Sequence, residues 1–95
     1  MKYKVLLTDD AVQDLDDLSG YMESCDSTAA ALYVLNEIEN RVTSLADNPT
    51  RGTWPKELLA LGIKEYREIF FKPYRIIYRI VQCDVYILLI TDGRR

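Results

Sequence analysis

The sequence predicts an α+β fold in which a helical hairpin packs on one face of a small, mainly antiparallel four-stranded sheet. Residues 64–81, KEYREIFFKPYRIIYRIV, contain two runs rich in aromatic and β-branched residues around Lys72-Pro73, a pattern typical of an antiparallel hairpin. Two stretches between residues 9 and 46 repeat apolar residues every three or four positions, as amphipathic helices do. The near-continuous apolar run 85–91 is typical of a strand covered on both faces. The predicted order is therefore strand, helix, helix, strand, strand, strand.

The first strand is expected over residues 3–7 (YKVLL), and Thr8-Asp9-Asp10 is expected to begin the first helix. A threonine oxygen can cap the free amide groups of the first turn, and acidic side chains favour the positive end of the helix dipole. Cys25-Asp26-Ser27 ends this helix, and Asp26 or Ser27 caps the next. The apolar stripe of the first helix consists of Ala11, Leu15, Leu18 and Met22.

The second helix is expected over residues 28–46, because Pro49 disfavours helical geometry at the residue before it. So short a link between two amphipathic helices predicts an antiparallel pair on one sheet face. Residues 50–63 are expected to form a loop with a helical turn at 57–61. The apolar stripe of the second helix consists of Ala31, Leu35, Ile38, Val42 and Leu45.

The last three strands are predicted to alternate between the two faces of the sheet. Pro73 marks the first turn because it has no amide hydrogen to donate, and Gln82-Cys83-Asp84 forms the second. The two helices cover one face, so we expect the other, apolar face to bind a partner protein or a second copy of the chain. The third strand should place Tyr74, Ile76, Tyr78 and Ile80 opposite Arg75, Ile77, Arg79 and Val81, and the fourth should place Val85, Ile87 and Leu89 opposite Tyr86, Leu88 and Ile90.

Length and composition exclude several classes of protein. With 95 residues, 48% apolar and 28% charged, the chain is expected to be one globular domain spanning residues 1–95. It has no basic region followed by an apolar run at its start and no segment of membrane-spanning length, so we expect it in the cytoplasm, away from membranes. Two separate cysteines and no histidine predict neither a disulfide framework nor a metal or cofactor site.

Charge is unevenly distributed along the chain. Residues 1–48 hold three basic and ten acidic side chains, a net charge of -7, whereas residues 49–95 hold nine basic and five acidic, a net charge of +4. The helices are therefore expected to be acidic and the sheet basic. A basic face could meet nucleic acid or an acidic protein, and the alternative is two solvated surfaces.

Several short motifs follow one another in a fixed order. Tyr66-Arg67-Glu68 begins the strand hairpin, YRIIYR at residues 74–79 continues it, and Gly93-Arg94-Arg95 follows the last strand. The helices contribute Leu18, Tyr21, Ala30, Tyr33, Val34, Leu45-Ala46, Asn48-Pro49 and Gly52. These motifs and their order resemble the RelE/ParE superfamily of bacterial toxins from type II toxin-antitoxin systems, and the helical motifs resemble its ParE branch. The resemblance implies a plasmid-stabilisation-type toxin that arrests growth and is neutralised by a cognate antitoxin, as a homodimer or a toxin-antitoxin hetero-oligomer.

The resemblance implies one of two targets. ParE-type members inhibit DNA gyrase, whereas RelE-type members cleave messenger RNA on the ribosome. For a ribonuclease, the resemblance implies that Arg75 and Arg95 are catalytic. Such a role suits a guanidinium, which stays charged and matches phosphate oxygens with paired donors. The histidine of some nuclease members is absent, and so is their tyrosine, which lies in a segment that family members usually carry after the final arginines and that this chain is expected to lack. We therefore favour gyrase, with an mRNA endoribonuclease, or a decayed toxin that only binds antitoxin, as alternatives.

Binding roles are assigned to Arg67, Tyr74, Arg79 and Arg94, each beside a structural alternative. Arg75 and Arg79 could simply form surface pairs with Glu65 or Glu68, and Arg67 could be a cross-strand partner. The aromatic residues, Trp54 included, could simply pack on the core. As a general base, Glu57 or Glu65 would need a raised pKa and a positioned nucleophile, so neither is assigned that role.

Overall fold

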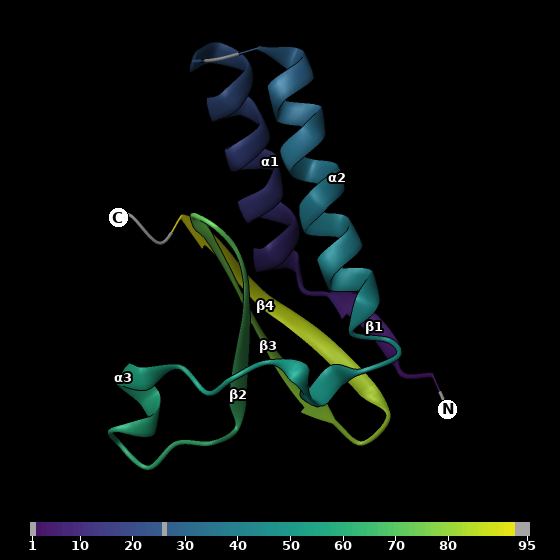
Figure 1. Cartoon of the computed structure of the whole chain (residues 1–95), viewed down its shortest axis with the longest axis vertical. Helices are drawn as coiled ribbons and strands as arrows, with labels where there is room; N and C mark the ends of the chain where they lie inside the picture. Colours follow the sequence, from purple (N-terminus) through teal and green to yellow (C-terminus); the bar gives the residue numbers. More distant parts are fainter. Residues whose placement is uncertain (1, 26, 93–95) are drawn as a thin grey trace.

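The computed structural model describes residues 2–25 and 27–92, without the side chains of residues 23–25. Asp26, Arg94 and Arg95, for which capping, binding and catalytic roles are predicted, lie outside the described residues. The elements follow the predicted order, with a 3-10 turn added before the predicted helical turn (Figure 1). They are β1 (Lys4–Leu7), α1 (Asp9–Cys25), α2 (Thr28–Ser44), the 3-10 turn η1 (Pro49–Arg51), α3 (Lys56–Leu59), β2 (Tyr66–Phe71), β3 (Tyr74–Val81) and β4 (Asp84–Asp92).

The four strands form one sheet in the order β1-β4-β3-β2. β1 runs parallel to β4, and the pairs β2–β3 and β3–β4 are antiparallel. The chain between β1 and its neighbour β4 contains the helical hairpin, the loop after it, and β2 and β3, which gives a parallel pair the long connection it needs. The predicted α+β fold and mainly antiparallel sheet are confirmed.

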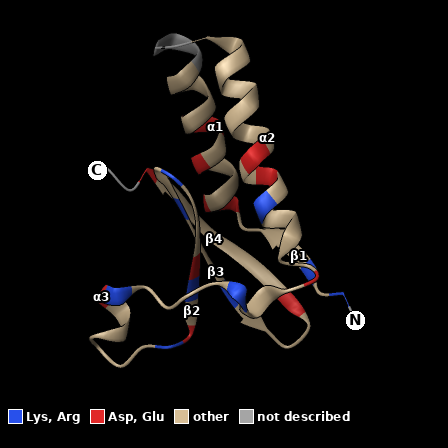
Figure 2. Cartoon of the chain, in the orientation of Figure 1, with Lys and Arg blue, Asp and Glu red and all other residues tan. Residues whose placement is uncertain are grey.

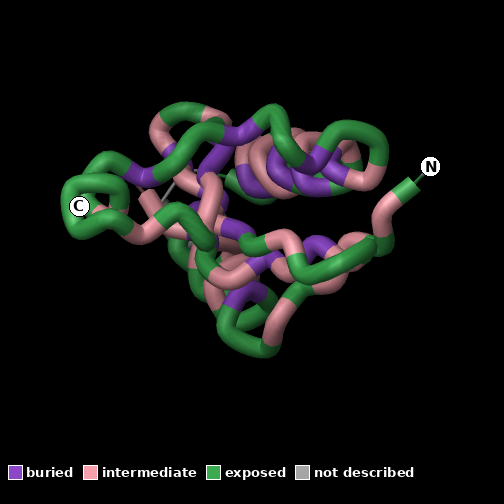
Figure 3. Tube along the Cα trace, turned by 90° about the horizontal axis from the view of Figure 1, so that it is seen from below, coloured by how far each residue is buried: buried purple, intermediate pink, exposed green. Residues whose placement is uncertain are grey.

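The helical hairpin lies over one face of the sheet (Figure 3), and its far end projects beyond the strands (Figure 1). Thr8 Oγ1 accepts a hydrogen bond from the amide of Ala11 at 3.3 Å, and Ser27 Oγ accepts from Ala30 at 3.1 Å, so both predicted caps are present. Of the predicted stripes, Ala11, Met22, Ala31, Ile38, Val42 and Leu45 are buried, Leu15 and Leu18 pack against them, and Leu35 is half-buried. The second helix ends at Ser44, two residues before the predicted limit.

One prediction about β4 is wrong. Val85 and Ile87 are buried as expected, but Leu89 is exposed and Ile90 is buried. The cause is an irregularity against β3, where Tyr78 pairs with Ile87 and Ile77 pairs with Leu89. Leu88 is thus an extra residue, and such a bulge reverses the face of every side chain that follows it.

Residues 49–54 close the β2 edge of the sheet. Thr53 and Glu68 exchange two backbone hydrogen bonds of 3.0 and 2.7 Å, which adds a short bridge beside β2. The buried Tyr78 hydroxyl donates to the carbonyl of Pro49 and accepts from the amide of Gly52 at 3.1 Å. Gly52 is required by this close approach, since a Cβ there would meet the Tyr78 hydroxyl and lie 2.8 Å from the carbonyl oxygen of Glu68. The loop is therefore fastened to the sheet, and its helical turn, α3, begins one residue earlier than predicted.

Charge follows the predicted division, with acidic side chains on α1 and α2 and most basic ones on the strands and the loop before them (Figure 2). Within the described residues, neither α1 nor α2 is apolar enough along a sufficient length to cross a bilayer. The sheet face turned away from α1 and α2, which we call the outer face, keeps Phe70, Val81 and Leu89 exposed. Partner binding there remains a prediction.

Candidate functional site: the Arg75 cluster on the outer face

Arg75 and Arg79 lie on the outer face because β3 alternates regularly along its length. Tyr74, Ile76 and Tyr78 are buried between the sheet and the helices, so the residues between them point the other way. Across β2, Arg75 is paired with Phe70 and Arg79 with Tyr66. The structure thus brings together two of the predicted arginines on one surface.

Arg75 is held by two carboxylates from different parts of the chain. Its Nε and Nη2 atoms donate to Glu68 Oε1 at 2.9 and 2.6 Å, across the strand hairpin. Its Nη2 and Nη1 atoms donate to the two oxygens of Glu57, on α3, at 2.9 and 3.4 Å. We call Glu57, Glu68 and Arg75 the Arg75 cluster.

The two acidic partners differ in exposure. The side chain of Glu68 is 7% exposed and that of Glu57 is 62% exposed, while that of Arg75 is 24% exposed. Glu68 is the most buried residue of the cluster; its backbone pairs with Thr53, and its side chain pairs with Arg75. A buried carboxylate needs such a partner, because an unpaired buried charge is strongly unfavourable.

Hydrogen bonding within the cluster stabilises the charged forms. Burial works against the charged guanidinium of Arg75, but the hydrogen bonds to Glu68 and Glu57 outweigh it and raise the pKa of Arg75 above its usual value. The same guanidinium lowers the pKa of Glu57, chiefly by its hydrogen bond. Glu57 is therefore a poor general base, in agreement with the sequence analysis.

Arg79 forms the surface pair that the sequence analysis gave as its structural alternative. Its Nη2 atom lies 3.8 Å from Glu65 Oε2, and both side chains are largely exposed. The guanidinium also lies 6.0 Å from the centre of the Tyr66 ring. A pair of this kind contributes about 0.2 to 1 kcal/mol, so Arg79 remains available to a partner.

Arg67 lies away from the Arg75 cluster. It belongs to the inward-facing set on the edge strand β2, opposite Tyr78, and turns toward the loop. Its Nη1 atom donates to the carbonyls of Gly52 at 2.9 Å and Thr50 at 3.3 Å, and its guanidinium lies 5.0 Å from the Trp54 ring. Arg67 thus orders the loop rather than pairing across the strands.

Tyr74 is buried and stacks on Phe71, with 6.3 Å between ring centres. Its strand position is opposite Asp92, and it lines a small hollow of about 180 Å³ between α1 and the end of β4. Tyr74 therefore lies on the opposite side of the sheet from the Arg75 cluster. Across the described part of the chain, no group of three potential metal ligands comes together, and a metal role is assigned to no residue.

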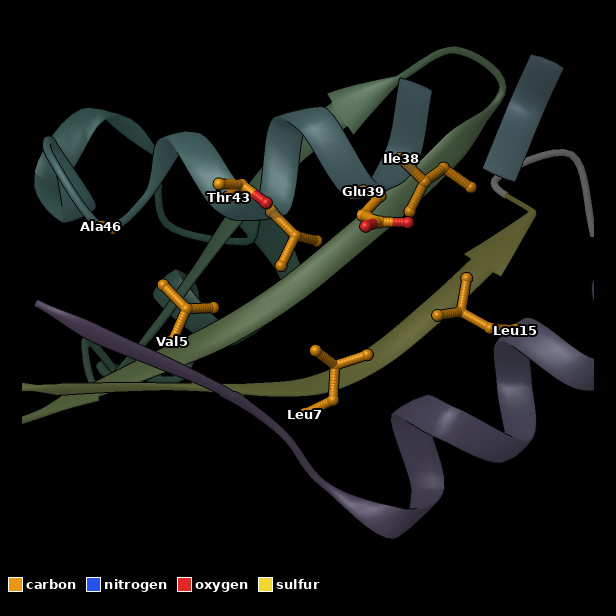
Figure 4. Close-up of a pocket in the computed structure, with 8 residues that line it drawn as sticks. Val5, Leu7, Leu15, Ile38, Glu39, Thr43 and Ala46 are labelled. Carbon is orange, nitrogen blue, oxygen red and sulfur yellow. The ribbon is translucent and has the colours of Figure 1, made fainter. Parts of the chain in front are cut away.

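The sequence does not indicate two further features of the folded chain. Glu57 was weighed only as a base, and nothing local indicates its pairing with a residue 18 positions away. The second feature is an apolar groove of about 410 Å³ between β1, α1 and α2 (Figure 4). Its lining residues are Val5, Leu7, Leu15, Ile38, Glu39, Val42, Thr43 and Ala46. The groove depends on the position of β1 at the end of the sheet, which can be known only once the order of all four strands is known.

A helical hairpin over one face of a four-stranded sheet, in the order β-α-α-β-β-β, is the fold of RelE/ParE toxins. Residues 5–95 match the family of ParE toxins of the type II toxin-antitoxin system parDE, and the chain belongs to that family. No curated protein matches the chain at a significant level.

Solved structures share this fold. A structure of the chromosomal ParDE toxin-antitoxin system from P. aeruginosa has a TM-score of 0.80 and 20% identity, covering 96% of each chain. The toxin-antitoxin complex RelBE2 from Mycobacterium tuberculosis has a TM-score of 0.69 and 22% identity, covering 97% of this chain and 92% of that one. A mutant of the E. coli toxin RelE bound to a peptide of the antitoxin RelB has a TM-score of 0.65 and 14% identity, covering 95% and 82%.

Proposed function

We propose that this ParE-family toxin acts in the cytoplasm, as a single domain, by binding and inhibiting DNA gyrase, and that a cognate antitoxin neutralises it. Family membership supports the growth-arresting role, since the matched range covers residues 5–95. The choice of gyrase over messenger RNA rests on the chemistry available around Arg75.

The observation that carries this choice is the double pairing of Arg75. A ribonuclease of this superfamily would need a guanidinium directed at the phosphate, yet both arms of Arg75 are occupied by Glu57 and Glu68. Two carboxylates beside one arginine repel a phosphate backbone, and binding to RNA draws much of its strength from neutralising phosphates. The cluster is therefore poorly suited to catalysis on RNA, and this favours gyrase as the target.

The second candidate is the ribosome-dependent mRNA endoribonuclease. It is favoured by the position of Arg75 on the outer face, beside a hollow of about 670 Å³ that opens to solvent. It would require Glu57 to leave Arg75, and it would require Arg95. A decayed toxin that only binds antitoxin would lack both activities.

For the antitoxin, we propose the groove between β1, α1 and α2 as part of the binding surface. The groove is lined mostly by apolar side chains, and Leu7 at its rim is 39% exposed on a strand at the end of the sheet. An apolar segment that lies in this groove would bury these side chains and could pair with the free edge of β1. A toxin-antitoxin hetero-oligomer would follow from such binding.

The direct test compares the two activities of purified protein. We expect the chain to inhibit supercoiling of relaxed plasmid by DNA gyrase, with addition of the antitoxin restoring activity. The same preparation is incubated with ribosomes programmed with messenger RNA. Cleavage of the message without inhibition of gyrase would reverse the proposal, and loss of both activities with retained antitoxin binding would identify a decayed toxin.

A further inference from the structure

The Arg75 cluster forms one side of a hollow that is built from three parts of the chain. The hollow has a volume of about 670 Å³ and lies between the loop before α3, α3 itself and the outer face of β2 and β3. Its walls include Trp54, Leu59 and Phe70, which are 37%, 41% and 44% exposed. Apolar walls around an ion pair form a surface that can hold an apolar segment and fix one charged group.

Of the two carboxylates that hold Arg75, Glu57 is the replaceable one. Glu68 is buried and keeps the Nε and Nη2 donors of Arg75 when Glu57 moves away. Glu57 is well exposed and lies on a helix of four residues within a loop. It meets Arg75 with both oxygens, which is the paired geometry that any incoming carboxylate would adopt.

The charges of the hollow favour a peptide over a nucleic acid. Without Glu57, Arg75 and Glu68 form a neutral pair, and Lys56 is the remaining charged residue of the lining. One carboxylate from a partner would restore the present pairing of Arg75. A phosphate chain would instead place several negative charges beside the buried Glu68, with few cations to balance them.

We propose that this hollow binds a peptide segment of a partner protein in which a carboxylate is flanked by apolar side chains, and that Glu57 occupies the carboxylate position until that segment arrives. The carboxylate of the partner pairs with Arg75, and its apolar neighbours pack on Trp54, Leu59 and Phe70. Glu57 acts as an internal competitor that lowers the affinity of the free chain. The site does not depend on whether the toxin acts on gyrase or on messenger RNA.

The test selects peptides from a phage-displayed random dodecapeptide library on the full chain carrying Glu57→Gln. We expect the selected peptides to share an acidic residue between apolar residues. They should bind the Glu57→Gln chain about two- to fivefold more tightly than the unchanged chain, because the exposed carboxylate that competes for Arg75 has been removed. Replacing the acidic residue of the peptide by its amide should weaken binding by a similar factor. The matched control is Glu65→Gln, which removes an exposed carboxylate paired with Arg79 and should leave the affinity unchanged.

Two further variants show where the peptide binds. Arg75→Gln should remove binding, and Phe70→Ala, at an exposed side chain, should weaken it even if Arg75→Gln fails to fold. Failure to enrich acidic peptides, or enrichment of peptides insensitive to Glu57→Gln and Phe70→Ala, would overturn the proposal. Binding of a uridine hexanucleotide by the Glu57→Gln chain at this hollow would also overturn the proposal, because the occupant would then be RNA. Dimerisation of the Glu57→Gln chain through the same face would overturn it as well, because the occupant would then be a second copy of the chain.

Discussion

At the scale of single residues, Tyr78 joins the core to the loop that carries Glu57. Its hydroxyl is buried and bonds to both Pro49 and Gly52, so one oxygen atom joins two points of the loop to the core. Burial raises the pKa of Tyr78, which keeps this hydroxyl protonated as a donor. The sequence predicts packing for Tyr78 from the alternation of β3, but its hydrogen bonds involve residues 26 and 29 positions away and leave no local pattern.

Removing this hydroxyl should cost stability. Tyr78→Phe leaves the buried amide of Gly52 and carbonyl of Pro49 without their partner, and we expect the free energy of unfolding to fall by about 1 to 3 kcal/mol. Urea unfolding followed by circular dichroism measures it. Tyr86→Phe, on the outer face, serves as the control, and an equal loss in both variants would contradict the role given to Tyr78.

Acid should release Glu57 from Arg75. The pKa of Glu57 is lowered from its usual 4.5, so the pairing is fully present above that value and is lost as the pH falls through the lowered pKa. Carbon-13 NMR of the Glu57 carboxyl group across pH 2 to 7 follows this titration directly. In a Glu68→Gln/Arg75→Gln double variant the pKa should return to its usual range; an unchanged titration would mean that Arg75 does not hold Glu57.

At the scale of elements, the two helical stripes predict α1 and α2 well. Each helix needs a continuous apolar face, so apolar residues recur every three or four positions in its sequence. The sequence predicts the extent of β4 but not which sheet face each of its side chains occupies, because the bulge at Leu88 depends on the register of β4 against β3. A run that is apolar at every position carries no sign of which residue is extra. The groove beside β1 escapes prediction for a similar reason, since it arises from the packing of three elements.

The groove can be blocked without disturbing the core. Thr43 is exposed on α2 and lines the groove, so Thr43→Arg should place a charged side chain in the path of an apolar antitoxin segment. We expect the affinity for the antitoxin to fall about tenfold or more, which corresponds to a loss of about 1.4 kcal/mol. Isothermal titration calorimetry measures it, with Asn36→Arg, exposed on the same helix outside the groove, as the control. Equal affinities of the two variants would place the antitoxin elsewhere.

At the scale of the whole molecule, the sequence predicts the division between acidic helices and basic strands, because the charge of each segment can be counted before its fold is known. It offers pairs of Arg75 and Arg79 with Glu65 or Glu68 only as alternatives to a functional role, and it does not indicate that Glu57 also reaches Arg75 in the folded chain. This engagement is the physical basis for preferring a toxin that acts by contact.

The arginine itself can be removed without leaving a buried charge. In the Glu68→Gln/Arg75→Gln double variant a neutral pair replaces the ion pair, so the fold should be retained. A toxin that acts by surface contact elsewhere should keep most of its growth inhibition, whereas a ribonuclease that depends on Arg75 should lose at least about a hundredfold in cleavage rate. Growth after induced expression, with antitoxin binding as the test of folding, separates the two outcomes.

Pulse-labelling after induced expression in bacteria tests the choice of target most directly. Thymidine and amino-acid incorporation are followed together over the first minutes, before secondary effects of growth arrest appear. Inhibition of gyrase predicts that thymidine incorporation falls first while protein synthesis continues. An initial fall in amino-acid incorporation would contradict the gyrase assignment and would make Arg75 a catalytic candidate on messenger RNA.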